Sequence, residues 1–124
     1  MAQKILIVDD SPSMRALEKT AMQKEGFEVI TAQDGAKALK IVNHQELDMI
    51  ITDINMPNMD GIAFTQEVRN GDSKNKFVPI LVVTTEGGMK MKTSGKVAGA
   101  SGWVVKPFTP ETLIAAVKKL LKIN

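Results

Sequence analysis

Short apolar runs alternate with amphipathic stretches five times along the chain. The apolar runs cover residues 4–8, 28–32, 48–52, 79–83 and 102–105. Runs of this length are typical of strands buried on both faces of a parallel sheet. Strands that alternate with helices imply such a sheet with helices on both faces. We therefore predict one α/β domain built from five βα units.

Helix signals occupy the stretches between the runs. The first and last expected helices open with a hydroxyl residue followed by proline, Ser11-Pro12 and Thr109-Pro110, a pattern typical of an N-cap and the first helical position. Gly26 suits the end of the first helix. Apolar residues recur at helical spacing in both helices: Met14, Leu17 and Ala21 in the first, and Leu113, Val117 and Leu120 in the last.

Glycine is concentrated around the expected fourth helix. Five of the nine glycines of the chain lie between residues 87 and 102. A glycine inside a helix costs about 1 kcal/mol relative to alanine. We therefore expect this helix to be weakly formed or mobile, unless most of these glycines occupy helix ends and turns.

Composition narrows the class of protein. At 124 residues, with 44% hydrophobic and 24% charged residues, the chain is typical of one globular domain. The lack of cysteine excludes disulfides and thiolate chemistry. No apolar stretch approaches the roughly 18 residues of a membrane span, and no signal-peptide pattern opens the chain. We expect a cytoplasmic protein without membrane insertion, in which residues 1–124 form one domain with no output domain.

Charge is unevenly distributed, although the net charge is only +2. Residues 1–87 carry nine basic and 13 acidic side chains, whereas residues 88–124 carry seven basic and one acidic. The basic part either keeps the surface soluble or forms a docking face for an acidic segment of a partner. Nucleic acid is the less favoured partner, because arginine is scarce and aromatic residues make up 4% of the chain.

Charged residues follow three of the apolar runs. Asp9 and Asp10 follow the first run, Asp53 the third and Lys106 the fifth. Parallel α/β sheets bind ligands beyond the carboxyl ends of their strands, so these residues are expected in one cleft. Three carboxylates about 5 Å apart repel by roughly 3 kcal/mol per pair at an effective dielectric constant near 20. The cluster therefore predicts a bound cation, and Mg²⁺ is the natural choice because it prefers oxygen ligands.

Lys106 and Thr84 add phosphate chemistry to this cleft. The ammonium of Lys106 can bind a phosphoryl oxygen as a point charge, although a lysine at this position could also be an ordinary surface residue. A cis peptide bond at Pro107 would direct Lys106 inward. Thr84-Thr85 at the end of the fourth run offers hydroxyl groups for a phosphoryl group, and Thr84 could instead cap a helix.

Four motifs, taken together and in order, resemble those of a known family. They are Val8-Asp9-Asp10-Ser11, residues 53–61 (DINMPNMDG), Thr84-Thr85-Glu86 and Val105-Lys106-Pro107-Phe108. Over essentially its whole length the chain is similar to bacterial two-component receiver domains, and among them to stand-alone chemotaxis regulators of the CheY type. The resemblance implies a doubly wound (βα)5 flavodoxin-like fold, with a parallel sheet in the order 2-1-3-4-5.

The resemblance also implies roles at the phosphorylation site. Asp53 would accept a phosphoryl group from the phosphohistidine of a CheA-like histidine kinase. Asp10 would bind Mg²⁺ directly and Asp9 through water, while Asp53 and the backbone carbonyl of Asn55 would complete the metal site. The protein would assist its own phosphorylation and dephosphorylation as a phospho-acceptor, and would not be an enzyme.

Further roles follow from the same resemblance. Thr84 and Lys106 would contact the phosphoryl group, and Thr84 would then move and let the ring of Trp103 turn inward as a switch. Asn55 and Glu86 would flank the attacking water and tune dephosphorylation. Two residues depart from the family pattern: Trp103 replaces the commoner Tyr or Phe, and Thr85 replaces a smaller residue, which would restrict phosphodonors or slow the attack of water.

The expected partners are proteins. A target such as the flagellar motor switch would bind the basic face around Lys90, Lys92, Lys96 and Trp103. A phosphatase is a further candidate partner, and the protein itself is expected to be a monomer.

Other functions remain open at this stage. One alternative is a phosphate sink or relay receiver that never engages the motor. An aspartyl-phosphate hydrolase of the haloacid-dehalogenase type is disfavoured, because Asp53-Ile54-Asn55 lacks the second acid of its D-x-D motif. A flavin-binding module is disfavoured because no Ser/Thr-rich phosphate loop follows the first run.

Overall fold

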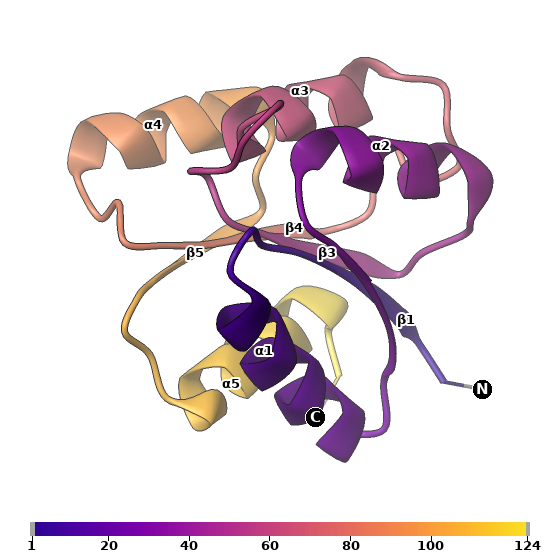
Figure 1. Ribbon diagram of the computed structural model, residues 1–124, viewed down its shortest axis with the longest axis vertical. Helices are drawn as coiled ribbons and strands as arrows, with labels where there is room; N and C mark the ends of the chain where they lie inside the picture. The colour runs from indigo at the N-terminus through magenta and orange to yellow at the C-terminus, as the bar shows by residue number, and fades with distance from the viewer. Residues whose placement is uncertain (1, 124) are drawn as a thin grey trace.

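The computed structural model describes residues 2–123, which form five strands and five helices in strict alternation (Figure 1). In chain order they are β1 (Lys4–Val8), α1 (Pro12–Lys24), β2 (Glu28–Ala32), α2 (Gly35–His44), β3 (Met49–Thr52), α3 (Gly61–Asn70), β4 (Ile80–Thr84), α4 (Met89–Ala98), β5 (Gly102–Val105) and α5 (Pro110–Leu121). No helix within residues 2–123 is long and apolar enough to cross a membrane.

The five strands form one parallel sheet in the order β2-β1-β3-β4-β5, which confirms the predicted doubly wound fold. Two strands, β3 and β4, differ from the sequence prediction by one residue at their boundaries. β3 begins after Asp48, whose carboxylate accepts a hydrogen bond from the backbone of Lys4 at 2.7 Å. β4 begins after Pro79, which has no N–H to donate, and it includes Thr84, whose carbonyl accepts from the backbone of Lys106 at 2.8 Å.

Apolar side chains pack on both faces of the sheet, as the continuous apolar runs predict. Successive strand residues point to opposite faces, so the same strands supply two cores. One core lies under α1 and α5, and the other lies under α2 and α3. Figure 1 shows α1 and α5 on one side of the sheet and α2, α3 and α4 on the other. The carboxyl ends of the strands therefore open between the two helix layers.

The predicted helix caps are present, but the buried face of α1 matches the predicted one only in part, since Ala21 is buried and Leu17 is not. Ser11 caps α1 by accepting from the backbone of Met14, and Thr109 caps α5 in the same way. Leu17, which the sequence pattern places on the apolar face, is 46% exposed. The face that packs on the sheet instead includes Glu18, together with Ala21 and Met22. The buried face is rotated toward Glu18, so an acidic side chain enters the interior.

The segment rich in glycine forms a complete helix of ten residues, α4. Gly88 is its N-cap, and Gly99 is its C-cap with a left-handed φ of +111°. Gly87 lies in the preceding loop and Gly102 begins β5, so Gly95 is the one of the five inside the helix. The alternative of helix ends and turns thus holds for three of the five, Gly87, Gly88 and Gly99, and the expected mobility stays a prediction.

Candidate functional site

Three carboxylates meet at the carboxyl ends of β1 and β3. Asp9, Asp10 and Asp53 each offer a carboxylate oxygen within 4.8 Å of the others. They meet because β1 and β3 are neighbours whose last residues, Val8 and Thr52, are paired in register. Asp9 is 1% exposed, the side chain of Asp53 is 12% exposed, and Asp10 faces solvent. The predicted acidic cluster is therefore formed, with a closed side and an open side.

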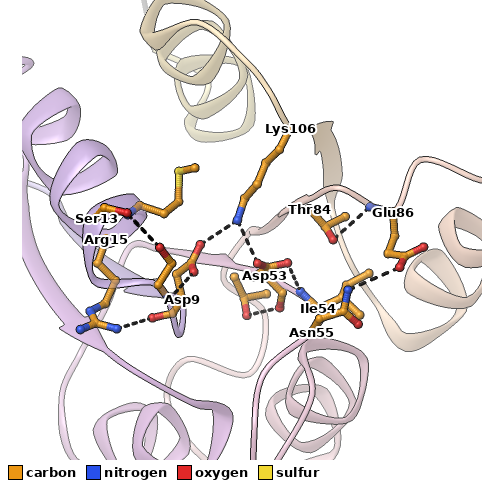
Figure 2. A network of polar contacts seen from close by, with 12 residues as sticks. Asp9, Ser13, Arg15, Asp53, Ile54, Asn55, Thr84, Glu86 and Lys106 are labelled. Carbon is orange, nitrogen blue, oxygen red and sulfur yellow. Dashed lines mark hydrogen bonds and ion pairs between the residues drawn. The ribbon is translucent and has the colours of Figure 1, made fainter.

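Lys106 reaches into this cluster from the end of β5. Its Nζ lies 2.9 Å from Oδ2 of Asp9 and 2.9 Å from Oδ2 of Asp53 (Figure 2). The side chain is 11% exposed, so Lys106 is not an ordinary surface residue. The peptide bond to Pro107 is cis, the isomer that the sequence analysis considered for directing Lys106 inward. Burial alone would lower the pKa of Lys106, but the hydrogen bonds and charges of Asp53 and Asp9 together raise it, so the ammonium stays charged.

Backbone groups hold the two paired carboxylates in place. Oδ1 of Asp53 accepts from the backbone of Ile54 at 2.6 Å, which leaves Oδ2 for Lys106. Oδ1 of Asp9 accepts from the backbone of Ser11 at 2.9 Å. The guanidinium of Arg15 donates to the carbonyl of Asp9 at 2.6 Å and ties α1 to the end of β1. Each carboxylate thus has one oxygen bound to the main chain and one directed into the cleft.

A second group of polar residues lies beside Asp53: Asn55 after β3, Thr84 at the end of β4, and Glu86 on the loop between β4 and α4. Thr84 is fully buried, and its hydroxyl accepts from the backbone of Glu86 at 3.2 Å. Thr84 is not a helix cap, because α4 begins only at Met89. The amide of Asn55 donates to Oε1 of Glu86 at 3.4 Å (Figure 2). The structure therefore brings together Asn55 and Glu86, which the sequence analysis paired.

Trp103 connects β5 to the same loop. Its indole Nε1 donates to the carbonyl of Glu86 at 3.0 Å, and its ring packs on Gly95 of α4. Lys92, Lys96 and Trp103 line a groove of about 240 Å³ between α4 and β5. Lys90 is exposed on the same helix. Lys92 and Lys96 thus share one groove with Trp103, adjoining the loop that borders Asp53, whereas Lys90 does not line it.

Sequence reasoning missed one buried acidic residue that feels the charges of this cluster, Glu18. This side chain is 1% exposed, and its Oε2 has no hydrogen-bond partner among the described residues. Burial, and secondarily the negative charges of Asp9 and Asp53, raise the pKa of Glu18 to about 8, against a lowering by Lys106. With this pKa, the carboxyl of Glu18 is protonated near neutral pH. The sequence did hold a signal of its burial, because Glu18 lies at helical spacing from Met14, Ala21 and Met22.

The donor set fits a hard divalent cation. Carboxylate oxygens are the ligands that Mg²⁺ prefers, and three of them converge here within 4.8 Å of one another. Asp10 presents the exposed carboxylate, so an ion can approach from solvent and keep several of its waters. The ammonium of Lys106 neutralises only part of the negative charge. The residues can therefore hold a metal ion beside Asp53.

Comparison with known proteins identifies the family. The sequence matches the family model of the response regulator receiver domain over residues 5–118. It is 38% identical over 123 residues to chemotaxis protein CheY1 of Helicobacter pylori, covering 98% of each chain. It is 38% identical over 120 residues to the probable transcriptional regulator ycf27 of Guillardia theta, with 97% of this chain covered. The chain spans about half the length of that relative, 46%.

Solved structures agree with this assignment. Chemotaxis response regulator CheY4 of Vibrio cholerae superposes with a TM-score of 0.91 and 45% identity, over 97% of this chain and 99% of that one. The receiver domain of a sensor histidine kinase of Pseudomonas aeruginosa, with a magnesium ion coordinated in its active-site cleft, superposes with a TM-score of 0.90 and 25% identity, over 98% of this chain and 99% of that one. The chain belongs to the response regulator receiver domain family.

Proposed function

We propose that the protein is a stand-alone, phosphorylation-gated signalling protein that accepts a phosphoryl group on Asp53 from a CheA-like histidine kinase. One observation carries the proposal. The carboxylate of Asp53 lies in a cluster with Asp9 and Asp10, and the ammonium of Lys106 is 2.9 Å from its Oδ2. A carboxylate that is ordered, partly exposed and flanked by metal ligands and a fixed cation is equipped to take up a dianionic group.

The transfer needs no acid or base at Asp53. A carboxylate oxygen of Asp53 attacks phosphorus, the N–P bond of the donor phosphohistidine breaks, and the imidazole nitrogen leaves with the electron pair. Lys106 shifts one of its two contacts from a carboxylate oxygen to a phosphoryl oxygen and stabilises the charge of the transition state. Its ammonium is already in place, because Asp9 keeps the second contact.

Asp9, Asp10, Asp53 and the backbone carbonyl of Asn55 would hold Mg²⁺. When bound, the ion supplies positive charge to the phosphoryl oxygens. The magnesium ion in the cleft of the Pseudomonas aeruginosa receiver domain supports this assignment. The carboxylate oxygens of Asp9 and Asp10 lie within 4.8 Å of that of Asp53, which suits direct binding by Asp10 and binding through water by Asp9.

The signal would leave the site through the loop between β4 and α4. The Thr84 hydroxyl accepts from the backbone of Glu86, and its own proton is free to be donated to a phosphoryl oxygen. A movement of Thr84 toward Asp53 pulls on this loop, whose Glu86 carbonyl is bound by Trp103. Asn55 and Glu86, at the rim, flank the path of water and tune dephosphorylation, to which a phosphatase would add.

The surface that reads this change would be the face formed by Lys90, Lys92, Lys96 and Trp103. Its basic charge suits an acidic segment of a protein target. The likeness to chemotaxis protein CheY1, which covers 98% of each chain, supports a role in chemotaxis. The protein would then act as a cytoplasmic monomer on the flagellar motor switch. A phosphate sink would use the same chemistry at Asp53 and lack this last interaction.

Acetyl phosphate and Mg²⁺ test the proposal. We expect a base-labile phosphoryl adduct by intact mass on the wild-type protein and none on the Asp53→Asn variant. An adduct of equal yield on Asp53→Asn, or none on the wild type, would contradict the assignment of Asp53. Binding of the motor switch protein only to the phosphorylated form supports the motor target, and phosphorylation without any gain in binding supports the sink.

A further inference from the structure

Gly95 lies in the middle of α4 and is buried against the ring of Trp103. A Cβ atom added at Gly95 would overlap Cζ3 of the indole and lie 3.2 Å from Cε3 and 3.5 Å from Cη2. All three atoms belong to the six-membered ring of the indole. Phenylalanine and tyrosine have a single ring and lack this second one. Glycine at this position is therefore matched to tryptophan at position 103.

The helix cannot withdraw to make room for a larger residue at position 95. The carbonyl of Gly95 accepts from the backbone of Gly99 at 3.1 Å and of Ala100 at 2.9 Å, which closes the C-terminal end of α4. The carbonyl of Gly99 in turn accepts from Nε of Arg69 on α3 at 3.0 Å. The same guanidinium binds the carbonyl of Val78 at 2.7 Å. Arg69 thus binds the C-terminal end of α4 to α3 and to the residues just before β4.

The indole is fixed from the other side as well. The backbone of Trp103 pairs with Val82 in the sheet, and its Nε1 donates to the carbonyl of Glu86 at 3.0 Å. The ring therefore fills the space between Gly95 and the loop from β4 to α4. It also forms the boundary between the groove along α4 and a second groove of about 550 Å³ along β5 and the start of α5.

We propose that Gly95 is a positioning residue of the switch: by lacking a side chain, it admits the indole of Trp103 and sets the hydrogen bond to Glu86 that ties β5 to the loop beside Asp53. The placement stands on the geometry alone, and its consequence for signalling rests on the proposed function. Any displacement of the ring alters both grooves and the tether to the loop at once.

The unphosphorylated protein tests the placement. Trp103 is the only tryptophan, so its fluorescence and the exchange of its indole N–H report on this ring alone. We expect Gly95→Ala to shift the emission to longer wavelength and to speed indole N–H exchange several-fold. Gly88→Ala is the matched control, because φ is −68° there and a Cβ would meet no described atom within 4 Å. Wild-type emission and exchange in Gly95→Ala would overturn the proposal.

Making Gly95→Ala in a Trp103→Phe variant separates the effect of contact with the indole from the effect of helix propensity. Alanine is the better helix former, so Gly95→Ala should raise the melting temperature once the indole is removed. We expect Gly95→Ala to lower the melting temperature in the wild-type background and to raise it in the Trp103→Phe background. If Gly95→Ala alone does not fold, folding of the double variant supports the proposal. A change in melting temperature of the same sign in the wild-type and Trp103→Phe backgrounds would overturn the proposal. So would a double variant that does not fold.

Acetyl phosphate and Mg²⁺ then connect the placement to the switch. We expect Gly95→Ala to form the Asp53 adduct as the wild type does, but to lose the change in Trp103 fluorescence that accompanies phosphorylation. A full wild-type fluorescence change in this variant would overturn the signalling role of Gly95. An adduct missing from every variant and from the wild type would instead contradict the proposed function, while the two tests above still decide the placement.

Discussion

At the scale of single residues, Glu18 places an acidic group inside the protein, where it feels the charges of Asp9 and Asp53. Burial, with Asp9 and Asp53 adding repulsion, raises the pKa of this carboxyl to about 8. The folded state therefore binds a proton that the unfolded state releases near pH 4.5. Stability from this group is complete below that pH, falls as the pH rises, and is lost by about pH 8. A neutral side chain of the same shape would escape this loss.

Glu18→Gln is expected to remove most of the decline in stability between pH 5 and pH 8. In the wild type, a pKa shift of this size lowers the free energy of unfolding by at most about 5 kcal/mol as the pH rises. Urea unfolding at several pH values measures it, with Glu67→Gln on the exposed face of α3 as the matched control. Equal pH dependence in the wild type and in Glu18→Gln would show that Glu18 is charged in the folded protein.

Gly61 is a second single residue that matters for the site, because its main chain packs directly against that of Asp53. A Cβ at Gly61 would overlap the carbonyl oxygen of Asp53 and lie 2.9 Å from Cα of Ile54, both of them main-chain atoms that cannot rotate away. We expect Gly61→Ala to lower the free energy of unfolding by about 2–3 kcal/mol, the usual cost of overpacking. Because the loop that carries Asp53 must move, adduct formation with acetyl phosphate should slow as well.

Gly88→Ala serves as the control for Gly61→Ala, since its added Cβ meets no described atom within 4 Å. The measurements are urea unfolding and the time course of the intact-mass adduct. Wild-type stability and rate in Gly61→Ala would mean that the start of α3 can retreat from the Asp53 carbonyl.

At the scale of elements, α4 is held firmly at one end only. Arg69 binds the loop after α4 through Gly99, whereas no side chain among residues 2–123 caps the helix at Gly88. Helix ends without capping partners fray first. The prediction of a weak fourth helix therefore narrows to its N-terminal turn, next to the loop that carries Glu86.

Hydrogen exchange measures this asymmetry. We expect the amides of the second turn of α4 and beyond to be better protected than those just after Met89, and the start of α1 to exchange more slowly than the start of α4. The reason is that Ser11 caps α1 and accepts from Met14. Uniform protection along α4, equal to that of α1, would refute a mobile N-terminal turn.

Sequence patterns predict these elements well but not their orientation. The five strands and the caps at Ser11 and Thr109 follow from local signals, and they are observed. The apolar pattern places Leu17 inward, yet it is exposed while Glu18 is buried, because the packing of α1 on the sheet decides which face is covered. Gly95 looks like a helix breaker by propensity, and its contact with Trp103 exists only in the folded chain.

At the scale of the whole molecule, the site depends on strand order. The bond from Lys106 to Asp9 joins residues 97 positions apart, and it forms because β1 and β5 end at the same edge of the parallel sheet, with β3 and β4 between them. The sequence indicates which residues end each strand. The binding of ligands at the carboxyl ends of parallel strands placed these residues in one cleft, whereas the order 2-1-3-4-5 came from the family resemblance, since no local pattern encodes it.

A divalent ion should bind this composite site and stabilise the whole fold. The repulsion among Asp9, Asp10 and Asp53 is only partly offset by Lys106, so the folded protein offers an anionic site that the unfolded chain lacks. Binding to the folded state alone adds about 2.7 kcal/mol of stability when the free ion is at 100 times its dissociation constant.

We expect Mg²⁺ to raise the melting temperature of the wild type and to have a much smaller effect on Asp10→Asn. Asp72→Asn, on an exposed loop, is the control and should respond like the wild type, with NaCl used to match ionic strength. An equal rise in Asp10→Asn would place the ion elsewhere on the protein.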